Sequence, residues 1–261
     1  MKKSVLAVVA ILCTANFIAC GGSSKSTAPK ASGLPERVLA SQSVTATSAF
    51  GGLVILNGEN DTIPRIAPIG AGNQPGLMAV SPSRNIAAAF DASSNTIFAV
   101  DTTKETGIGN VRLLGISNSF VVPTTSPLGY AAVPSAAVTG YAFTGAIQEL
   151  NFLSQSALTI AVNNAQTVIS NDTGTQLLVF SGDSDSVTVL NPLNAVPPVD
   201  TSCYGTLPNP VCTVVPGFDR PVFAIINNNT AYILNCGPQC GGTQASVMVL
   251  TFLSLILASV L

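Results

Sequence analysis

The side chains that most enzymes use for catalysis are scarce in this chain. Its 261 residues include no histidine and no tryptophan, and only 8% of them are charged. Without histidine, the chain cannot build a Ser-His-Asp or Cys-His nucleophile, and it cannot build a metal site with imidazole ligands. We therefore assign no catalytic residue and expect no metal and no cofactor.

A few charged residues fall outside the expected turns and are the candidates for a polar site. They are Arg112, Glu149, Asp172, Asp219 and Arg220. Carboxylates at active sites usually have several polar neighbours that shift their pKa values. The sequence shows no such cluster, because these five residues are spread over more than a hundred positions.

Two short acidic segments have some of the residue types found in calcium loops. They are NGEND at 57–61 and DSD at 183–185. Neither has the Gly at position six and the Glu at position twelve of the twelve-residue calcium loop. Both fall between apolar runs, where Asp, Asn and Gly are favoured because of the backbone conformations of turns. We interpret both segments as hairpin turns.

Four cysteines lie in the C-terminal third of the chain: Cys203, Cys212, Cys236 and Cys240. In an exported protein an even number of cysteines indicates disulfides. Three pairings are possible, and we expect Cys203–Cys212 and Cys236–Cys240, because each would close a short loop rich in Pro or Gly. A zinc site with four Cys ligands is the alternative, although its usual pair spacing is shorter than the one between Cys203 and Cys212.

The N-terminus has the pattern of an export signal. A basic start, MKK, precedes the apolar stretch 5–12, which is too short to span a bilayer. FIAC at 17–20, followed by GGSS, resembles the lipobox of bacterial lipoproteins. The resemblance implies a signal peptide over 1–19 that is removed before Cys20, and acylation of Cys20. Several acyl chains on one residue anchor a protein firmly, since each buried CH₂ contributes ~0.8 kcal/mol.

Residues 20–35 predict a flexible linker behind this anchor. The sequence GGSSKSTAPKASGLP from residue 21 has almost no apolar side chain to bury. We therefore expect a lipid-anchored protein of the bacterial cell envelope, held in the outer membrane and facing the periplasm or the cell surface. Ten basic and twelve acidic residues exclude nucleic acid as a partner, because phosphate binding needs clustered Lys and Arg.

The rest of the chain repeats an apolar strand that ends in Asn or Asp. The copies are LVILN (53–57), IFAVD (97–101), IQELN (147–151) and VTVLN (187–191), and VMVL (247–250) is a fifth that is followed by Thr. The ends of the first four lie 44, 50 and 40 residues apart, because 101 − 57 = 44, 151 − 101 = 50 and 191 − 151 = 40. Such a period indicates propeller blades or helical arrays, and the Val, Ile, Thr, Gly and Pro content excludes the helical option.

One repeat is clearer than the others. LMAVSP (77–82), a polar turn, IAAAF (86–90), the turn DASSN (91–95) and TIFAVD (96–101) follow one another. This unit, over 77–103, resembles the YVTN-type β-propeller repeat, which is akin to NHL and lactonase-like propellers. A second copy occupies 166–190 and a third occupies 218–234, and the unit at 116–151 is a looser match. The resemblance implies an all-β propeller of four-stranded blades over residues 36–250.

Five blades are visible, whereas the propellers that the chain resembles mostly have six to eight. Residues 251–261, TFLSLILASVL, are nearly all apolar and their status is open. We favour a reading frame truncated or shifted near residue 251, which would remove later blades. The alternative is a buried final strand that closes a five-bladed ring.

These expectations favour a non-catalytic binding or scaffold module whose partner is an unidentified protein or carbohydrate. The Pro/Gly-rich segments 123–140 and 197–217 are the loops on which we expect a partner to dock. Two alternatives stay open: a lactonase-like hydrolase and a non-functional truncated propeller. A propeller fold cannot decide among them, because propellers carry many unrelated activities.

Overall fold

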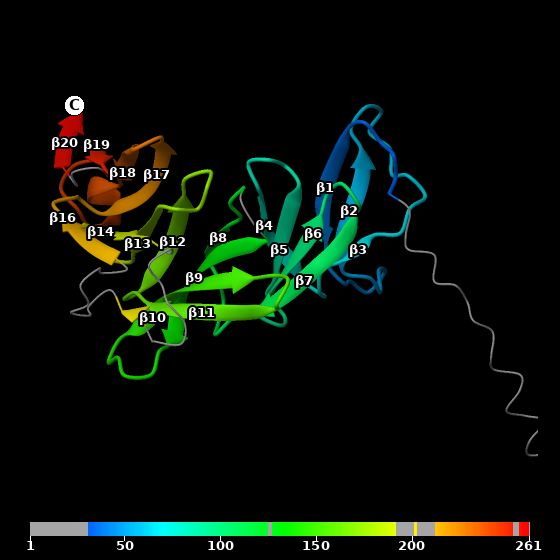
Figure 1. The fold of residues 1–261 in the computed structure, drawn as a ribbon, viewed down its shortest axis with the longest axis horizontal. Helices are drawn as coiled ribbons and strands as arrows, with labels where there is room; N and C mark the ends of the chain where they lie inside the picture. Colours follow the sequence, from blue (N-terminus) through cyan, green and yellow to red (C-terminus); the bar gives the residue numbers. More distant parts are fainter. Residues whose placement is uncertain (1–30, 125–126, 192–200, 203–211, 253–255, 261) are drawn as a thin grey trace, which may run out of the picture. The chain divides into compact units, whose positions relative to one another are not determined.

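The structure is a computed structural model that describes residues 31–124, 127–191, 201–202, 212–252 and 256–260. Strands in these ranges form five sheets that follow one another along the chain, and colour marks this order in Figure 1. We number them sheet 1 to sheet 5. All pairings between strands are antiparallel except that of β11 (Ser156–Ala161) with β15 (Thr201–Ser202).

The strands of each sheet are as follows. Sheet 1 contains β1 (Arg37–Gln42), β2 (Gly52–Asn57) and β3 (Ile69–Gly70). Sheet 2 contains β4 (Pro75–Val80), β5 (Ile86–Asp91), β6 (Thr96–Asp101) and β7 (Thr106–Arg112). Sheet 3 contains β8 (Ser119–Val121), β9 (Leu128–Ala137), β10 (Thr144–Asn151), β11 and β15.

The remaining two sheets have the same up-and-down order. Sheet 4 contains β12 (Ala165–Ser170), β13 (Leu177–Ser181), β14 (Ser186–Leu190) and β16 (Cys212–Pro216). Sheet 5 contains β17 (Pro221–Asn227), β18 (Thr230–Asn235), β19 (Ser246–Thr251) and β20 (Ile256–Val260). A short 3₁₀ helix, η2 (Gly237–Cys240), lies between β18 and β19. No helix in these described ranges has the length and hydrophobicity to span a membrane.

The all-β fold with four-stranded antiparallel blades, predicted from the repeat, is confirmed. Three of the five sheets have four strands, sheet 1 has three, and sheet 3 gains a fifth because β15 joins the edge of β11. The recurring strand that ends in Asn or Asp is the third strand in sheets 2, 3 and 4, and its Thr-ended counterpart β19 is the third strand in sheet 5.

Consecutive sheets pack face to face and bury apolar side chains between them. Four clusters of buried side chains fill the four junctions from sheet 1–sheet 2 to sheet 4–sheet 5. All six residues of β5 are buried, among them Ala87, Ala88 and Ala89. Because successive side chains of a strand point to opposite faces, these small residues let neighbouring sheets approach on both sides.

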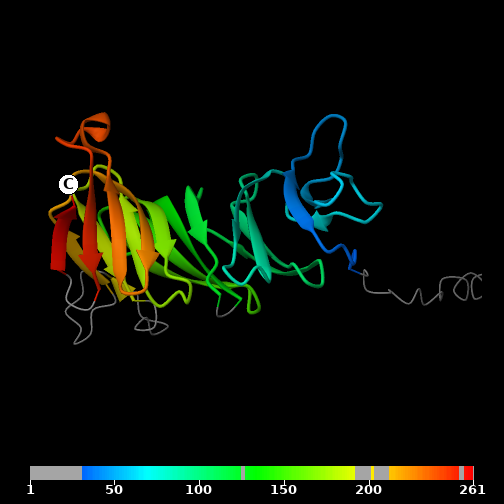
Figure 2. The ribbon, with the colours of Figure 1, turned by 90° about the horizontal axis from the view of Figure 1, so that it is seen from above.

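The first strands of consecutive sheets also lie next to one another. β1 contacts β4, β4 contacts β8, β8 contacts β12, and β12 contacts β17. In Figure 2 the sheets follow in the same order, with the strands of sheet 5 side by side in orange and red. This stacking of each blade against the next is the arrangement of propeller blades.

A common four-residue turn follows the strands that end in Asn or Asp. The end residue pairs across the turn with Thr or Ser: Asn57 with Thr62, Asp91 with Thr96, Asp101 with Thr106, and Asn151 with Ser156. The end residue's Oδ1 accepts main-chain N–H groups inside the turn; Asp101, for example, accepts from Thr103 and Lys104 at 2.9 Å each. The fourth residue of each turn has a positive φ: Asp61, Asn95, Glu105 and Gln155, at 53–55°.

This turn accounts for the terminal Asn or Asp of the repeat. A short side chain that accepts hydrogen bonds from the residues two and three positions ahead closes the turn without outside help. The interpretation of 57–61 as a turn is therefore confirmed: Asn57 accepts from the N–H of Glu59 at 3.0 Å, and Asp61 has a φ of 54°. In the DSD segment, Asp183 likewise has a positive φ of 56° at a turn between strands.

The prediction of a docking loop over residues 123–140 is wrong for most of its length. Residues Leu128–Ala137 form β9, the strand next to β10 in sheet 3, and five consecutive residues of it are buried. Its Pro and Gly content suggested a loop, but Pro134 falls where the pairing with β10 is irregular, and a proline is tolerated there. Within 197–217, residues 212–216 form β16, and 197–200 and 203–211 lie outside the described residues.

The apolar segment 251–261 also contains a strand. Residues Ile256–Val260 form β20, which pairs with β19 from Val247↔Val260 to Thr251↔Ile256. Ile256–Val260 is therefore the fourth strand of sheet 5. Four residues separate the paired Thr251 and Ile256, as in the turns that follow Asn or Asp.

The shared turn leads to a test at the β10–β11 hairpin. Asn151→Ala removes a side chain that accepts from the N–H groups of Leu153 and Ser154, both at 3.0 Å. We expect the free energy of unfolding, measured by urea denaturation, to fall by about 1 kcal/mol. Gln155→Gly in the same turn is the control: glycine adopts the positive φ freely, so stability should be unchanged or slightly higher. A loss with Gln155→Gly equal to that with Asn151→Ala would contradict the turn model.

Candidate functional site

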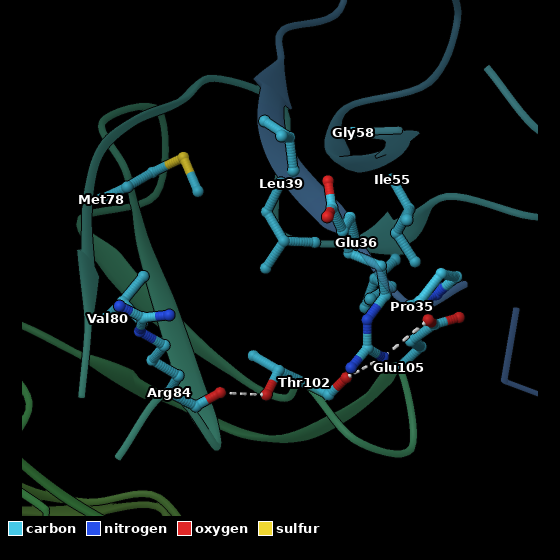
Figure 3. A pocket seen from close by; sticks show the side chains of 13 residues that line it. Pro35, Glu36, Leu39, Ile55, Gly58, Met78, Val80, Arg84, Thr102 and Glu105 are labelled. Atoms are coloured by element: carbon cyan, nitrogen blue, oxygen red, sulfur yellow. Dashed lines mark hydrogen bonds and ion pairs between the residues drawn. The ribbon is translucent and has the colours of Figure 1, made fainter. Parts of the chain in front are cut away.

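A cleft of about 640 Å³ opens between sheet 1 and sheet 2. Its walls are apolar: Leu39 and Ile55 come from sheet 1, and Met78 and Val80 from sheet 2 (Figure 3). Its volume lies in the range of small-molecule and side-chain binding pockets, about 300–1,000 Å³.

The packing of sheet 1 leaves room for this cleft. Leu53, Ile55 and Ile69 of sheet 1 pack with Ala89 and Val100 of sheet 2 at the buried part of the junction. Beyond them the side chains are only partly covered: Val80 is 52% exposed. The cleft is thus the open continuation of an inter-sheet core.

An ion pair closes one end of the cleft. The Nη1 atom of Arg37 in β1 lies 2.9 Å from Oε1 of Glu105, and it donates to the carbonyl oxygen of Thr102 at 2.7 Å. Figure 3 labels Thr102 and Glu105 at this end of the cleft. Glu105 occupies the positive-φ position of the β6–β7 turn, so the turn geometry aims its side chain across at sheet 1.

Ser32 also binds Glu105. Its main-chain N–H donates to Oε2 at 2.6 Å, and its hydroxyl donates to Oε1. Leu34 packs on the sheet 1–sheet 2 core, and Pro35 lines the cleft. The last residues of the predicted linker 20–35 thus contact the first two sheets.

These contacts change the pKa of Glu105. Burial of the carboxylate opposes its charge, but the hydrogen bonds from Ser32 and the ion pair with Arg37 outweigh burial and lower the pKa. The side chain of Glu105 is only 6% exposed, and that of Arg37 is 31% exposed. The ion pair is therefore shielded from water on its acidic side and remains ionised at neutral pH.

A second arginine supplies charge that is not neutralised. Arg84 lies in the β4–β5 turn with a φ of 58°, and its carbonyl oxygen accepts a hydrogen bond from the Thr102 hydroxyl at 2.6 Å. Its guanidinium extends beside Val80 at the rim of the cleft (Figure 3). It forms no ion pair with any residue in the described ranges. The cleft thus combines apolar walls with one available cation.

The charged residues singled out from the sequence do not converge. Arg112 ends β7 in sheet 2, Glu149 lies in β10 of sheet 3, and Asp172 is exposed in the turn after β12 of sheet 4. Asp219 and Arg220 precede β17 of sheet 5. None of the five lines the large cleft.

Glu149 is half-buried beside Tyr130 of β9. The two residues are cross-strand partners on the face of sheet 3 that packs against sheet 4. Burial raises the pKa of Glu149, and burial together with the nearby Glu149 charge raises the pKa of Tyr130. The Oε2 atom of Glu149 has no hydrogen-bond partner among the described residues.

Asp219 and Arg220 have structural contacts. The Asp219 carboxylate accepts from the hydroxyl and N–H of Thr243 and from the N–H of Gln244, and these bonds lower its pKa. Nε of Arg220 lies 3.7 Å from Oδ1 of Asp185. Asp219 thereby holds the loop that follows η2 against the start of sheet 5.

The prediction of disulfides is confirmed at one pair. Cys236 and Cys240 are bonded, with 5.7 Å between their Cα atoms, at the two ends of the η2 turn. Cys212 is also disulfide-bonded, whereas Cys203 lies outside the described residues. The zinc alternative is therefore wrong for Cys212, Cys236 and Cys240. Across the described ranges no three His, Cys, Asp or Glu side chains come together as metal ligands.

The residues that form the cleft could not be selected from the sequence. Arg37 lies in a strand, and Arg84 and Glu105 lie in turns, where polar side chains are ordinary. Their proximity depends on the packing of sheet 1 against sheet 2, which brings residues 65 and 68 positions apart into contact.

Comparisons with known proteins identify the fold but no family. No protein-family profile matches the sequence, and no curated protein matches it. The structure is similar to Kuenenia stuttgartiensis hydrazine synthase, with a TM-score of 0.53 and 14% identity over 82% of this chain. It is also similar to U3-55K, with a TM-score of 0.51 and 13% identity over 80% of this chain. The chain spans 60% of the length of each matched structure.

Both matched structures have β-propeller-type folds. Together with the five stacked sheets, this likeness defines the chain as a β-propeller-type repeat protein. Identities of 13% and 14% show the fold alone, because propellers carry many unrelated functions.

The ion pair at the end of the cleft predicts a pH-dependent loss of stability. Glu105→Gln should lower the free energy of unfolding at pH 7 by about 1 kcal/mol, since it replaces a charged acceptor of the Arg37 and Ser32 bonds. The folded-state pKa of Glu105 is lowered, so this stabilisation is present above the ordinary value of 4.5 and is lost as the pH falls through the lowered value.

Urea denaturation of both proteins from pH 7 to pH 2.5 measures this difference. The two unfolding free energies should converge at the acidic end. Glu59→Gln changes an exposed carboxylate in the β2–β3 connection and serves as the control. A difference between wild type and Glu105→Gln that persists undiminished at low pH would show that charge is not its cause.

Proposed function

We propose that this chain is a non-catalytic binding module of the cell envelope, exported and lipid-anchored through Cys20. The observation that carries the binding role is the cleft between sheets 1 and 2, which joins apolar walls to the unpaired guanidinium of Arg84. The resemblance of residues 77–103 to YVTN-type propeller repeats supports a module built for surface recognition.

The cleft favours a protein ligand over a carbohydrate. Leu39, Ile55, Met78 and Val80 offer aliphatic surface, and no aromatic ring lines the cleft to stack on a sugar. An extended peptide segment with one apolar side chain and one carboxylate matches the walls and Arg84. The apolar side chain would replace water against the walls, and the carboxylate would form a charge-assisted hydrogen bond with the guanidinium.

A non-catalytic role is supported by the chemistry of the cleft residues. The two carboxylates there are Glu36, which is exposed, and Glu105, which is held by Arg37 and Ser32. A general acid needs a raised pKa near the working pH, whereas the pKa of Glu105 is lowered. The purified chain should therefore turn over none of a panel of lactones.

Peptide selection tests the binding role. A random dodecapeptide phage library is selected on the purified chain, and the selected peptides are measured by fluorescence anisotropy. We expect acidic peptides with one large apolar residue, and we expect Arg84→Ala and Met78→Glu each to weaken their binding at least fivefold, or about 1 kcal/mol.

Arg65→Ala is the matched control, because it removes the same charge from an exposed arginine outside the cleft. It should leave the affinity unchanged. Equal losses with Arg65→Ala and Arg84→Ala would indicate a general charge effect and contradict the cleft as the binding site.

Metabolic labelling tests the anchor. Cells that express the wild-type chain are grown with radioactive palmitate, and we expect the label in the protein, because Cys20 ends the lipobox-like segment FIAC at 17–20. Cys20→Ser should abolish labelling. Cys13→Ser, within the predicted signal peptide, is the control and should leave labelling unchanged, because Cys20 is still present. Absence of label in the wild-type chain would refute lipidation. Cys20 lies outside the described residues, so this proposal rests on the sequence.

A further inference from the structure

The last sheet has an apolar face that nothing in the described chain covers. In β17 and β18, Ala224, Ile226, Ala231 and Ile233 point toward sheet 4 and pack in the sheet 4–sheet 5 core. The residues that alternate with them point the other way. We call this opposite surface the trailing face of sheet 5, and it comprises Phe223, Ile225, Tyr232, Leu234, Val247 and Val249.

The trailing face is exposed and continuous. Ile225 is 65% exposed, and Phe223, Tyr232 and Leu234 are each 44–45% exposed. Ile225 pairs with Tyr232 and Phe223 pairs with Leu234 across β17 and β18, so the four side chains are direct neighbours. Contiguous apolar surface of this kind on a soluble domain marks an interaction site.

The same positions in sheet 4 are buried by the next sheet. In sheet 4, Leu178 pairs with Val189 and Phe180 pairs with Val187. These side chains pack against sheet 5, and Leu178, Phe180 and Val187 are at most 1% exposed.

Sheet 5 repeats this arrangement strand for strand. Tyr232 pairs with Val249 and Leu234 pairs with Val247, again between the second and third strands of the sheet. The trailing face of sheet 5 is therefore the equivalent of a surface that another sheet covers one blade earlier.

The first sheet carries the complementary kind of face. Leu39, Leu53 and Ile55 of sheet 1 pack toward sheet 2. The alternate residues of β1 and β2 point away and form what we call the leading face of sheet 1: Val38, Ala40, Val54 and Leu56. Val38 is 50% exposed.

The absence of charge on both faces and the order in which the sheets stack favour a contact between these two faces. The residues that define the trailing face and the leading face include no charged side chain. Each of the four junctions within the chain pairs the trailing face of one sheet with the leading face of the next. A contact between the trailing face of sheet 5 and a leading face would repeat this junction, whereas a contact between two trailing faces would not.

We propose that the trailing face of sheet 5 binds the leading face of sheet 1 in a second copy of this chain. The contact is heterologous, so it extends a pair into a closed ring or a linear assembly. It does not depend on the anchor at Cys20. Leu39 and Ile55 of the cleft point away from the leading face, whereas Val38 borders both the leading face and the cleft.

Sedimentation velocity of the purified full-length chain tests this proposal. The wild-type chain should contain species heavier than the monomer. Ile225→Glu on the trailing face and Leu56→Glu on the leading face should each reduce the assembly to monomer, because a buried carboxylate without a partner opposes the contact. Leu56 is chosen because it does not line the cleft.

Mixing the two variants gives the decisive measurement. Each variant retains one intact face, so the equimolar mixture should form a one-to-one dimer and nothing larger. Recovery of the dimer also shows that both variants are folded. Leu153→Glu, at a 69% exposed position in the β10–β11 turn, is the control and should assemble like the wild type.

Four results would overturn the proposal. They are a wild-type chain that is monomeric at high micromolar concentration, assembly that survives both substitutions, a Leu56→Glu variant that still dimerises through two trailing faces, and a mixture of folded variants that stays monomeric. Circular dichroism of each variant verifies folding in the last case. If the chain assembled through residues 1–30 instead, both substituted variants would still assemble.

Discussion

The sheets of this protein are apolar on both faces, and each must therefore be covered on both sides by another sheet. In β5 six consecutive residues are buried, and its three alanines allow sheets 1 and 3 to approach from either side. Only 8% of the residues are charged, so few positions in the chain can form a solvated face. The stacking of sheet on sheet, the cores between them and the bare faces of sheets 1 and 5 all follow from this requirement.

The cleft and the exposed leading and trailing faces both result from the face-to-face stacking of consecutive sheets. Where both sheets have four strands, as sheets 4 and 5 do, the junction fills with buried side chains such as Phe180 and Phe218. Sheet 1 is smaller, because β3 has only two residues, and its junction with sheet 2 stays open at one end. At that end the two sheets are joined by the ion pair of Arg37 with Glu105 and not by apolar side chains.

Much of the fold could be predicted from the sequence, because the residues that recur in the repeat form hydrogen bonds with their neighbours in the chain. The strand that ends in Asn57, Asp101 or Asn151 is visible in the sequence since its terminal side chain closes the turn that follows. Strand β9 was mistaken for a loop because Pro134 lies where its pairing is irregular, a feature that depends on β10. The cleft could not be predicted, because Arg37, Arg84 and Glu105 meet only through the packing of two sheets.

In the four-residue turns, the residues that fix the backbone conformation differ from those that are exposed to solvent. In the β6–β7 turn, Asp101 and the positive-φ position of Glu105 fix the backbone, while Thr102, Thr103 and Lys104 face the exterior or are partly exposed. Those three positions hold unrelated residues in the other turns, such as Ala92, Ser93 and Ser94 after Asp91. In the β6–β7 turn, substitutions at the exposed positions Thr103 and Lys104 can therefore change the surface of the protein without altering the sheets that the turn belongs to.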